Sequence, residues 1–139
     1  MVHGESRWGW TLKPSDDRLT PPEVMEPLTI MFGKLFDPCP YPKPSVDYLE
    51  VGWDIKNFVN PPYSQIRYWA SVAVREAEFG RFTAFLIPND CSTLSFRILR
   101  DASWGRWEIP FRVKFIDPHK NRLVDVARSH VVFFIGGLP

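Results

Sequence analysis

The sequence has little cysteine, no long apolar run and almost no net charge, and each absence excludes a class of protein. Cys39 and Cys91 are the only cysteines among 139 residues and lack metal-site spacing, so we expect reduced thiols in a cytoplasmic protein. The longest apolar runs, FTAFLIP and HVVFFIGGLP, are too short to span a bilayer, and no membrane partner is expected. MVHGESRWGW has no apolar core of a secretory signal. A net charge of +1 excludes a strongly basic nucleic-acid coat.

Proline, in contrast, is abundant. The chain has fourteen prolines, and their clustering between Pro38 and Pro62 predicts an ordered loop rather than regular structure there. Hydrophobic residues make up 45% and charged residues 24%, as in globular proteins, so residues 1–139 are expected to form a single domain. The three histidines are scattered without metal-ligand spacing, and we predict no metal site and no role for them.

Helical and strand patterns alternate along the chain. Helices are predicted over residues 20–33, 64–80 and 93–101, and strands over 34–38, 56–59, 82–87, 107–117 and 129–135. Thr20 and Glu23 have capping-box spacing, Pro21 suits a first helical position, and Ser64 is the expected cap of the second helix. Residues 39–54 and 117–128 are predicted as loops.

This alternation predicts an α/β fold, with a parallel-rich sheet between helices on both faces. In such sheets, ligands bind at the carboxyl ends of the strands. Three predicted strands end in polar or proline-containing sequences, namely Asp37-Pro38, Asn60-Pro61-Pro62-Tyr63 and Pro88-Asn89-Asp90. We therefore expect these three segments to line one crevice.

The NPPY tetrapeptide has the groups that methylation of an exocyclic amine requires. Such a nitrogen is a poor nucleophile, because its lone pair is delocalised into the ring. Two acceptors that bind its N–H groups can shift it towards tetrahedral geometry, and preorganised groups of this kind stabilise developing charge. Asn60 Oδ1 and the Pro61 carbonyl are candidate acceptors, and the Tyr63 ring can stack on a flat substrate.

NPPY resembles the catalytic motif of amino-methyltransferases that use S-adenosylmethionine. LFDPCPYP is similar to their strand-end D-P-x-x-G motif, and LTPPEVMEPL resembles the segment that precedes that strand. From about Trp10 to Ile135, the chain resembles the small phage-type DNA N-6-adenine methyltransferases. The resemblance implies a minimal three-layer Rossmann-like sheet, and a phage- or virus-encoded protein acting in the host cytoplasm.

The resemblance also assigns roles to residues. It implies S-adenosylmethionine as cofactor and DNA as partner, with the target adenine flipped out of the helix. The residues at the target amine are Asn60, Pro61, Pro62 and Tyr63. The residues at the cofactor are Asp37, Pro38, Thr20 and Pro21, with Asp54 near the adenosine or the target base.

Two departures from the family keep other functions open. DPCPYP lacks the glycine that normally follows the first strand and lets backbone approach the ligand. This favours a non-catalytic nucleic-acid-binding or structural protein on a degenerate methyltransferase core. No separate target-recognition domain is expected, and RNA or a protein glutamine are alternative targets of the same chemistry.

The same residues also have structural interpretations. NPPY can be a rigid connection, Asp37-Pro38 a strand terminator, TPPE a helix start and Asp54 a turn residue. Trp8 and Trp10 are the tryptophans most suited to cover a ligand. A basic face for phosphate contact, or simply a solvated surface, is predicted from Arg97, Arg100, Arg106, Arg112, Lys114, Lys120 and Arg122.

Overall fold

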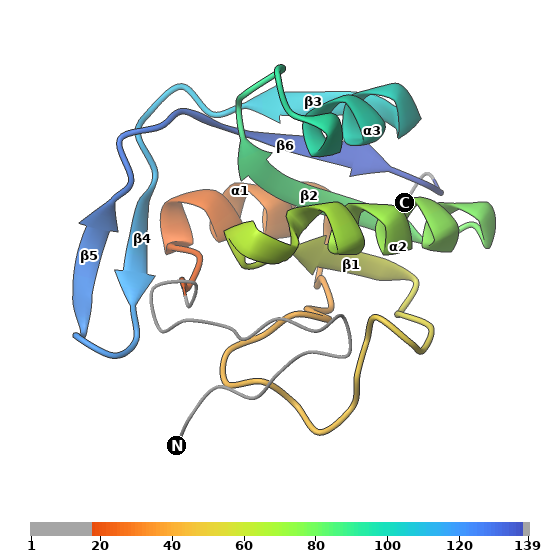
Figure 1. Ribbon diagram of the computed structural model, residues 1–139, viewed down its shortest axis with the longest axis horizontal. Helices are drawn as coiled ribbons and strands as arrows, with labels where there is room; N and C mark the ends of the chain where they lie inside the picture. Colours follow the sequence, from red (N-terminus) through yellow and green to blue (C-terminus); the bar gives the residue numbers. More distant parts are fainter. Residues whose placement is uncertain (1–17, 138–139) are drawn as a thin grey trace.

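A four-stranded sheet and a separate hairpin organise the chain in the computed structural model, which describes residues 18–137 (Figure 1). The sheet has the order β1-β2-β6-β3. Its strands are β1 (Lys56–Val59), β2 (Phe82–Pro88), β6 (His130–Ile135) and β3 (Ser103–Glu108). The hairpin consists of β4 (Lys114–Asp117) and β5 (Arg122–Asp125). Trp8 and Trp10 lie outside the described residues.

The sheet is mixed, so the expectation of a parallel-rich sheet is wrong. β1 and β2 are parallel, whereas β6 is antiparallel to both of its neighbours, β2 and β3. The cause lies in the segment between β3 and β6. Its predicted polar loop contains β5, and the β4–β5 hairpin brings the chain back to the sheet end at which β3 finished. The chain can then only enter the sheet in the opposite direction.

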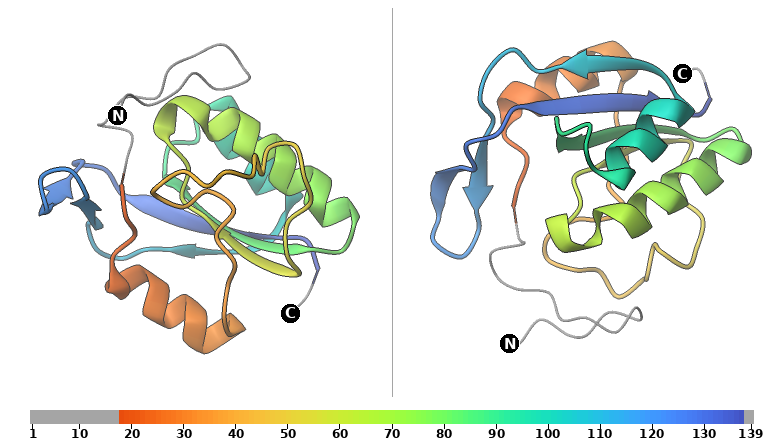
Figure 2. Two further views of the ribbon diagram at one scale, coloured as in Figure 1. Left: turned by 90° about the horizontal axis from the view of Figure 1, so that it is seen from below. Right: turned by 45° about the horizontal axis from the view of Figure 1, so that its top comes forward.

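Helices cover both faces of the sheet, as predicted, and give three layers (Figure 2). α1 (Pro22–Phe32) packs on one face through Val24, Leu28 and Phe32. α2 (Ile66–Glu78) and α3 (Leu94–Ala102) pack on the other. β2 is buried at every position, because its alternate side chains enter the two cores. The coarse α/β prediction is confirmed.

Two helix starts differ from the prediction. The N-cap of α1 is Pro21 rather than Thr20, no side chain caps the helix, and Pro22 occupies the first helical position. The predicted capping box is therefore wrong. A 3-10 turn, η2 (Tyr63–Gln65), precedes α2, whose N-cap is Gln65 rather than Ser64. Thr93, in contrast, caps the predicted helix α3 and accepts a hydrogen bond from the Phe96 N–H.

The predicted strand at 34–38 is reduced to one bridging residue. The Phe36 N–H donates to the Lys56 carbonyl at 2.9 Å, and the Phe58 N–H donates to the Phe36 carbonyl at 2.8 Å. This parallel bridge places Phe36 beside β1 at the edge of the sheet. Asp37 and Asn60 therefore follow neighbouring extended segments that run in the same direction.

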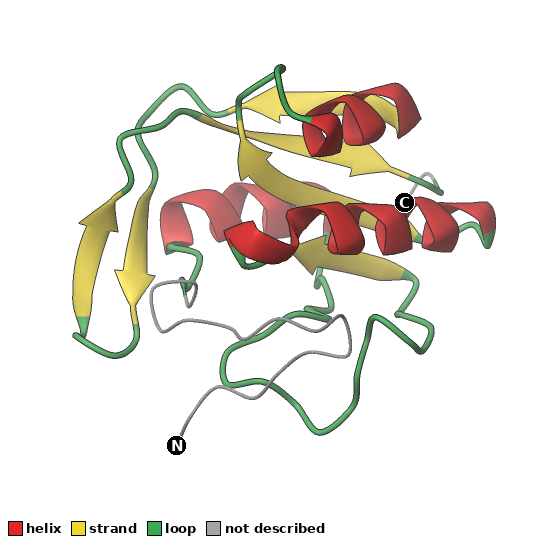
Figure 3. Cartoon of the chain, viewed as in Figure 1, coloured by secondary structure: helices red, strands yellow, loops and turns green. Residues whose placement is uncertain are grey.

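The hairpin extends away from the main sheet (Figure 3). The predicted strand over 107–117 is interrupted at Pro110, because proline lacks the N–H that a ladder needs. An antiparallel bridge joins Leu19 to Ile116 and ties the segment before α1 to the hairpin. None of the helices found between residues 18 and 137 is long and apolar enough to cross a membrane.

Candidate functional site

A cavity of about 310 Å³ lies at the carboxyl end of β1, within the size range of small-ligand sites. Three parts of the chain line it: the segment before α1, the proline-rich loop after Phe36, and the turn that leads from β1 into α2. Five of the predicted site residues line it together: Thr20, Asp37, Pro38, Asn60 and Pro62. Four others do not line it: Pro21, Asp54, Pro61 and Tyr63.

Asn60 is held in one orientation by two acceptors. Its Nδ2 donates to the Arg18 carbonyl at 3.2 Å and to Thr20 Oγ1 at 3.0 Å. Because the Arg18 carbonyl can only accept, the nitrogen end of the amide must face it. Asn60 Oδ1 is consequently the free end, and no group within residues 18–137 donates to it. A half-buried side chain with a fixed, available acceptor thus lines the cavity.

Thr20 does not form the capping box that its sequence spacing predicts. Its hydroxyl binds the Asn60 amide instead of capping α1. Pro21 is buried beside it, and its carbonyl accepts the N–H groups of Val24 and Met25 at the start of the helix. Thr20 therefore belongs to the cavity wall, whereas Pro21 belongs to the helix start.

Asp37 carries a perturbed carboxyl on the cavity wall. Burial among the surrounding loop residues raises the pKa of Asp37 to about 6, although the Cys39 N–H, which donates to Oδ1 at 2.8 Å, acts to lower it. The residue still opens on the cavity, so the carboxyl is both partly desolvated and accessible. A carboxyl of this kind is ionised at neutral pH and can bind a cationic group.

The two prolines connect Asn60 to the 3-10 turn. Pro61 is buried, and among the described residues no N–H donates to its carbonyl. The Pro62 carbonyl, in contrast, accepts the Gln65 N–H at 2.9 Å. The Pro61 carbonyl therefore keeps an unused acceptor next to Asn60.

Tyr63 lies outside the cavity and contacts His130. Its hydroxyl is 2.9 Å from His130 Nε2, and the two rings are stacked with centroids 6.5 Å apart. His130 Nδ1 lies 3.2 Å from the Arg128 carbonyl, which can only accept, so Nε2 accepts from the tyrosine. Burial raises the pKa of Tyr63 to about 12 and lowers the pKa of His130. The residue is 38% exposed, so part of it still meets solvent.

Asp54 is separated from the other predicted residues. It precedes the amino end of β1, whereas Asn60 follows the carboxyl end. Its Oδ1 accepts the Ile55 N–H at 2.7 Å, and its carbonyl accepts from Asn57 Nδ2 at 2.8 Å. These bonds are those of a turn that leads into the strand, as in the structural interpretation of this residue.

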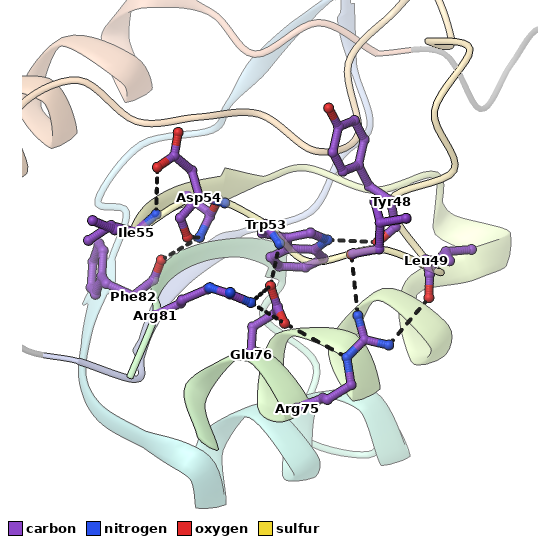
Figure 4. Close-up of polar contacts among 11 residues, drawn as sticks. Tyr48, Leu49, Trp53, Asp54, Ile55, Arg75, Glu76, Arg81 and Phe82 are labelled. Carbon is purple, nitrogen blue, oxygen red and sulfur yellow. Dashed lines mark hydrogen bonds and ion pairs between the residues drawn. The ribbon is translucent and has the colours of Figure 1, made fainter. Parts of the chain in front are cut away.

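A buried carboxylate anchors the proline-rich loop to α2 (Figure 4). Glu76, 1% exposed, accepts the Trp53 N–H and binds Arg81 Nη1 through both oxygens, at 2.9 and 3.0 Å. Trp53 Nε1 in turn donates to the Tyr48 carbonyl at 2.7 Å, and Tyr48 lines the cavity. Arg75 reaches the Leu49 carbonyl. This network fixes the loop against α2.

Gln65 and His130 have contacts that the sequence analysis did not predict. Gln65 is 4% exposed, lines the cavity and accepts from Trp69 Nε1 at 3.1 Å. The signal for it is a polar residue four positions before a tryptophan on the same helical face. His130 begins a strand that is otherwise apolar, and a polar residue there indicates a buried partner.

Four of the predicted basic residues have acidic or aromatic partners within the structure. Arg112 and Lys114 both contact Asp125 in the hairpin, while Arg100 pairs with Asp101 on α3. Arg106, on β3, lies over the Phe133 ring. In the part of the chain that the structure describes, no group of three or more His, Cys, Asp or Glu residues could hold a metal ion.

No protein-family model, curated protein or solved structure matches this chain. What the site does is therefore inferred from its own residues.

Proposed function

We propose that the chain transfers a methyl group from S-adenosylmethionine to the exocyclic amine of adenine in DNA. The observation that carries this proposal is the orientation of Asn60. Its two donors are used by Arg18 and Thr20, so its acceptor remains for an amine. The neighbouring Pro61 carbonyl supplies a second acceptor at the end of the same strand. Two fixed acceptors match an amine with two N–H groups.

The cavity residues fit the cofactor chemically. S-adenosylmethionine combines a flat base, a sulfonium and an amino-acid group, and when bound it supplies an electrophilic methyl group. Asp37 can bind a cationic amine, and Lys43 is a cation that can pair with a carboxylate. Tyr48, Phe58 and Trp69 provide aromatic surface for the base. Donors, acceptors and ring surfaces are thus available for each part of the molecule.

The protein contributes position and electrostatics to the reaction. Asn60 Oδ1 and the Pro61 carbonyl accept the two N–H bonds of the target amine and increase its nucleophilicity. Tyr63 stacks its solvent-exposed side on the flipped base, while His130 holds its hydroxyl. An amine held in a fixed position by these two acceptors would lose less freedom on reaction, which lowers the entropic part of the barrier.

Transfer of a labelled methyl group tests this proposal. The full chain is incubated with labelled S-adenosylmethionine in three separate reactions, which contain DNA, RNA or protein as the target. Label in the adenine of DNA, absent with the Asn60→Ala variant, is the expected result. Label appearing only in RNA, or only in protein glutamine, would reassign the target while keeping the chemistry.

A non-catalytic nucleic-acid-binding protein on a methyltransferase-like core is the second candidate. The glycine-free loop favours it, because four prolines between residues 38 and 44 limit how closely backbone can approach a ligand. Calorimetry with S-adenosylhomocysteine separates the candidates. Binding in the micromolar range supports the enzyme, and no heat at millimolar ligand supports the non-catalytic protein.

A further inference from the structure

Gln65 leaves a buried donor without a partner. Trp69 Nε1 can only donate, so the atom of Gln65 that it contacts at 3.1 Å must be Oε1. Nε2 is therefore the free end of the amide, and no acceptor within residues 18–137 binds it. An unsatisfied donor on a side chain that is 4% exposed is costly unless a water or ligand binds it.

The free end of Gln65 faces the cavity. Among the described residues, Thr83 Oγ1 is the one side-chain atom that is both fully enclosed and unpartnered. Gln65 Nε2 is unpartnered but not fully enclosed, and the open space that Gln65 lines is the cavity. The 3-10 turn holds its backbone through the Pro62 carbonyl. The position of the donor is thus fixed by Trp69 at the side-chain amide and by Pro62 at the backbone.

Gln65 and Asn60 present opposite polarity to the same space. Asn60 offers an acceptor and Gln65 a donor, and each amide is locked by a neighbour that fixes its orientation. A ligand that satisfies both carries an N–H donor and an acceptor on one edge. The Watson–Crick edge of a 6-aminopurine has this pattern in its amine and N1, and hypoxanthine has the inverse pattern.

We infer that Gln65 is a specificity-determining residue that donates a hydrogen bond to N1 of a 6-aminopurine ring whose amine binds Asn60. The ligand class rests on the proposed function, because both the cofactor and the target base carry this ring. The pair accepts an amino edge and rejects a keto edge, since a keto edge leaves both amides facing like groups. Trp69 is a positioning residue that acts through Gln65.

Nucleoside analogues test the contact with N1. Calorimetry on the full chain measures the dissociation constants of adenosine, 1-deazaadenosine, 7-deazaadenosine and inosine. The wild type is expected to bind 1-deazaadenosine about tenfold more weakly than adenosine, as for one lost hydrogen bond to a buried donor, and to bind inosine more weakly still. 7-Deazaadenosine, which keeps N1, is the matched control and binds like adenosine.

The Gln65→Met variant should abolish this discrimination. The ratio between 1-deazaadenosine and adenosine falls to about one if Gln65 reads N1, because methionine has no N–H and neither ligand can then form the bond. The inference is overturned if the ratio stays at tenfold in the variant. It is also overturned if the wild type binds 7-deazaadenosine as weakly as 1-deazaadenosine, or does not bind adenosine at all. Gln65→Glu keeps the acceptor for Trp69 but lacks the donor, and it should lose the ratio without losing the fold.

Two further measurements identify the source of the ring. If the cofactor's adenine occupies the site, Gln65→Met weakens S-adenosylhomocysteine about tenfold and leaves the KM for DNA unchanged. If the target adenine occupies it, the KM rises and the cofactor affinity stays constant. An unchanged value in both arms overturns the inference, even where methyl transfer itself is observed. Conversely, N1-dependent binding without methyl transfer keeps the inference and refutes the proposed reaction.

Discussion

Two polar networks flank the start and the end of α2, and they differ in what they leave unpaired. Around Glu76, the carboxylate binds Arg81 and the Trp53 N–H, and its charge is compensated on all sides. Around Asn60, two donors are used but one acceptor stays available. A saturated network stabilises the fold, whereas a network that is ordered but incomplete is ready for a ligand. Different substitutions should therefore damage different properties.

Asn60→Ala should have the largest effect, and mainly on activity. Without Oδ1 the amine loses one of its two acceptors, and removal of a single preorganised group of this kind costs about a hundredfold or more in rate. The fold should lose only about 1–2 kcal/mol, from two hydrogen bonds of which one is to a hydroxyl. Labelled methyl transfer and urea unfolding measure the two effects. Full activity in this variant would exclude Asn60 from the site.

Glu76→Ala should have the opposite effect. It removes a carboxylate that is 1% exposed and leaves the Arg81 guanidinium and the Trp53 N–H without their partner. We expect a loss of about 3 kcal/mol in the free energy of unfolding. Glu78→Ala, on the same helix but exposed, is the control and should change stability by less than about 0.5 kcal/mol. Equal losses in the two variants would refute the anchoring role of Glu76.

The sequence predicts most elements of this fold but not the path of the last third of the chain. Lys56–Val59 is matched without error, because its two apolar residues come shortly after a turn and shortly before two prolines. The hairpin is missed because β5 has only two apolar residues, is mostly exposed and lies within a polar segment, so the apolar signal from which strands are recognised is weak. The direction of β6 depends on that hairpin. Strand direction is a property of connections, which local patterns do not contain.

The candidate site shows the same limit. Polar residues after strands correctly predict that Asp37 and Asn60 line one cavity, since neighbouring extended segments run in parallel. The third predicted segment, Pro88-Asn89-Asp90, does not line that cavity, and the Asn89 N–H donates to the Ser129 carbonyl instead. Local spacing is misleading at Thr20, whose hydroxyl binds a residue 40 positions away instead of the helix that it precedes. The Tyr63 contact with His130 spans 67 positions. Such pairs follow from the folded topology and cannot be read from periodicity.

Asp37 makes the cavity side of the molecule sensitive to pH. Its pKa of about 6 lies above the 3.8 of an unperturbed aspartate, because burial disfavours the charged form. Between pH 4 and 6 the folded state therefore binds more protons than the unfolded state. The stability that this carboxyl contributes is fully present below pH 4 and is lost as the pH rises through 6.

The Asp37→Asn variant tests this pH dependence. Its thermal midpoint should vary less between pH 4 and 6 than that of the wild type. Asp101→Asn, at an exposed ion pair on α3, is the control and should keep the wild-type profile. If Asp37→Asn and the wild type have parallel profiles, the carboxyl does not titrate in this range. Cofactor binding should also weaken in the wild type below pH 6, as the carboxyl becomes neutral.

Tyr63→Phe should have the smallest effect, because it removes only the hydroxyl that binds His130. One hydrogen bond of 2.9 Å is lost, which predicts a decrease of about 1 kcal/mol in stability. The ring remains available for stacking, so methyl transfer should stay within about threefold of the wild type. Tyr63→Ala removes the ring and should reduce transfer much more. If Tyr63→Phe instead abolishes transfer, the hydroxyl takes part in the chemistry, and the pair with His130 belongs to the reactive site rather than to its support.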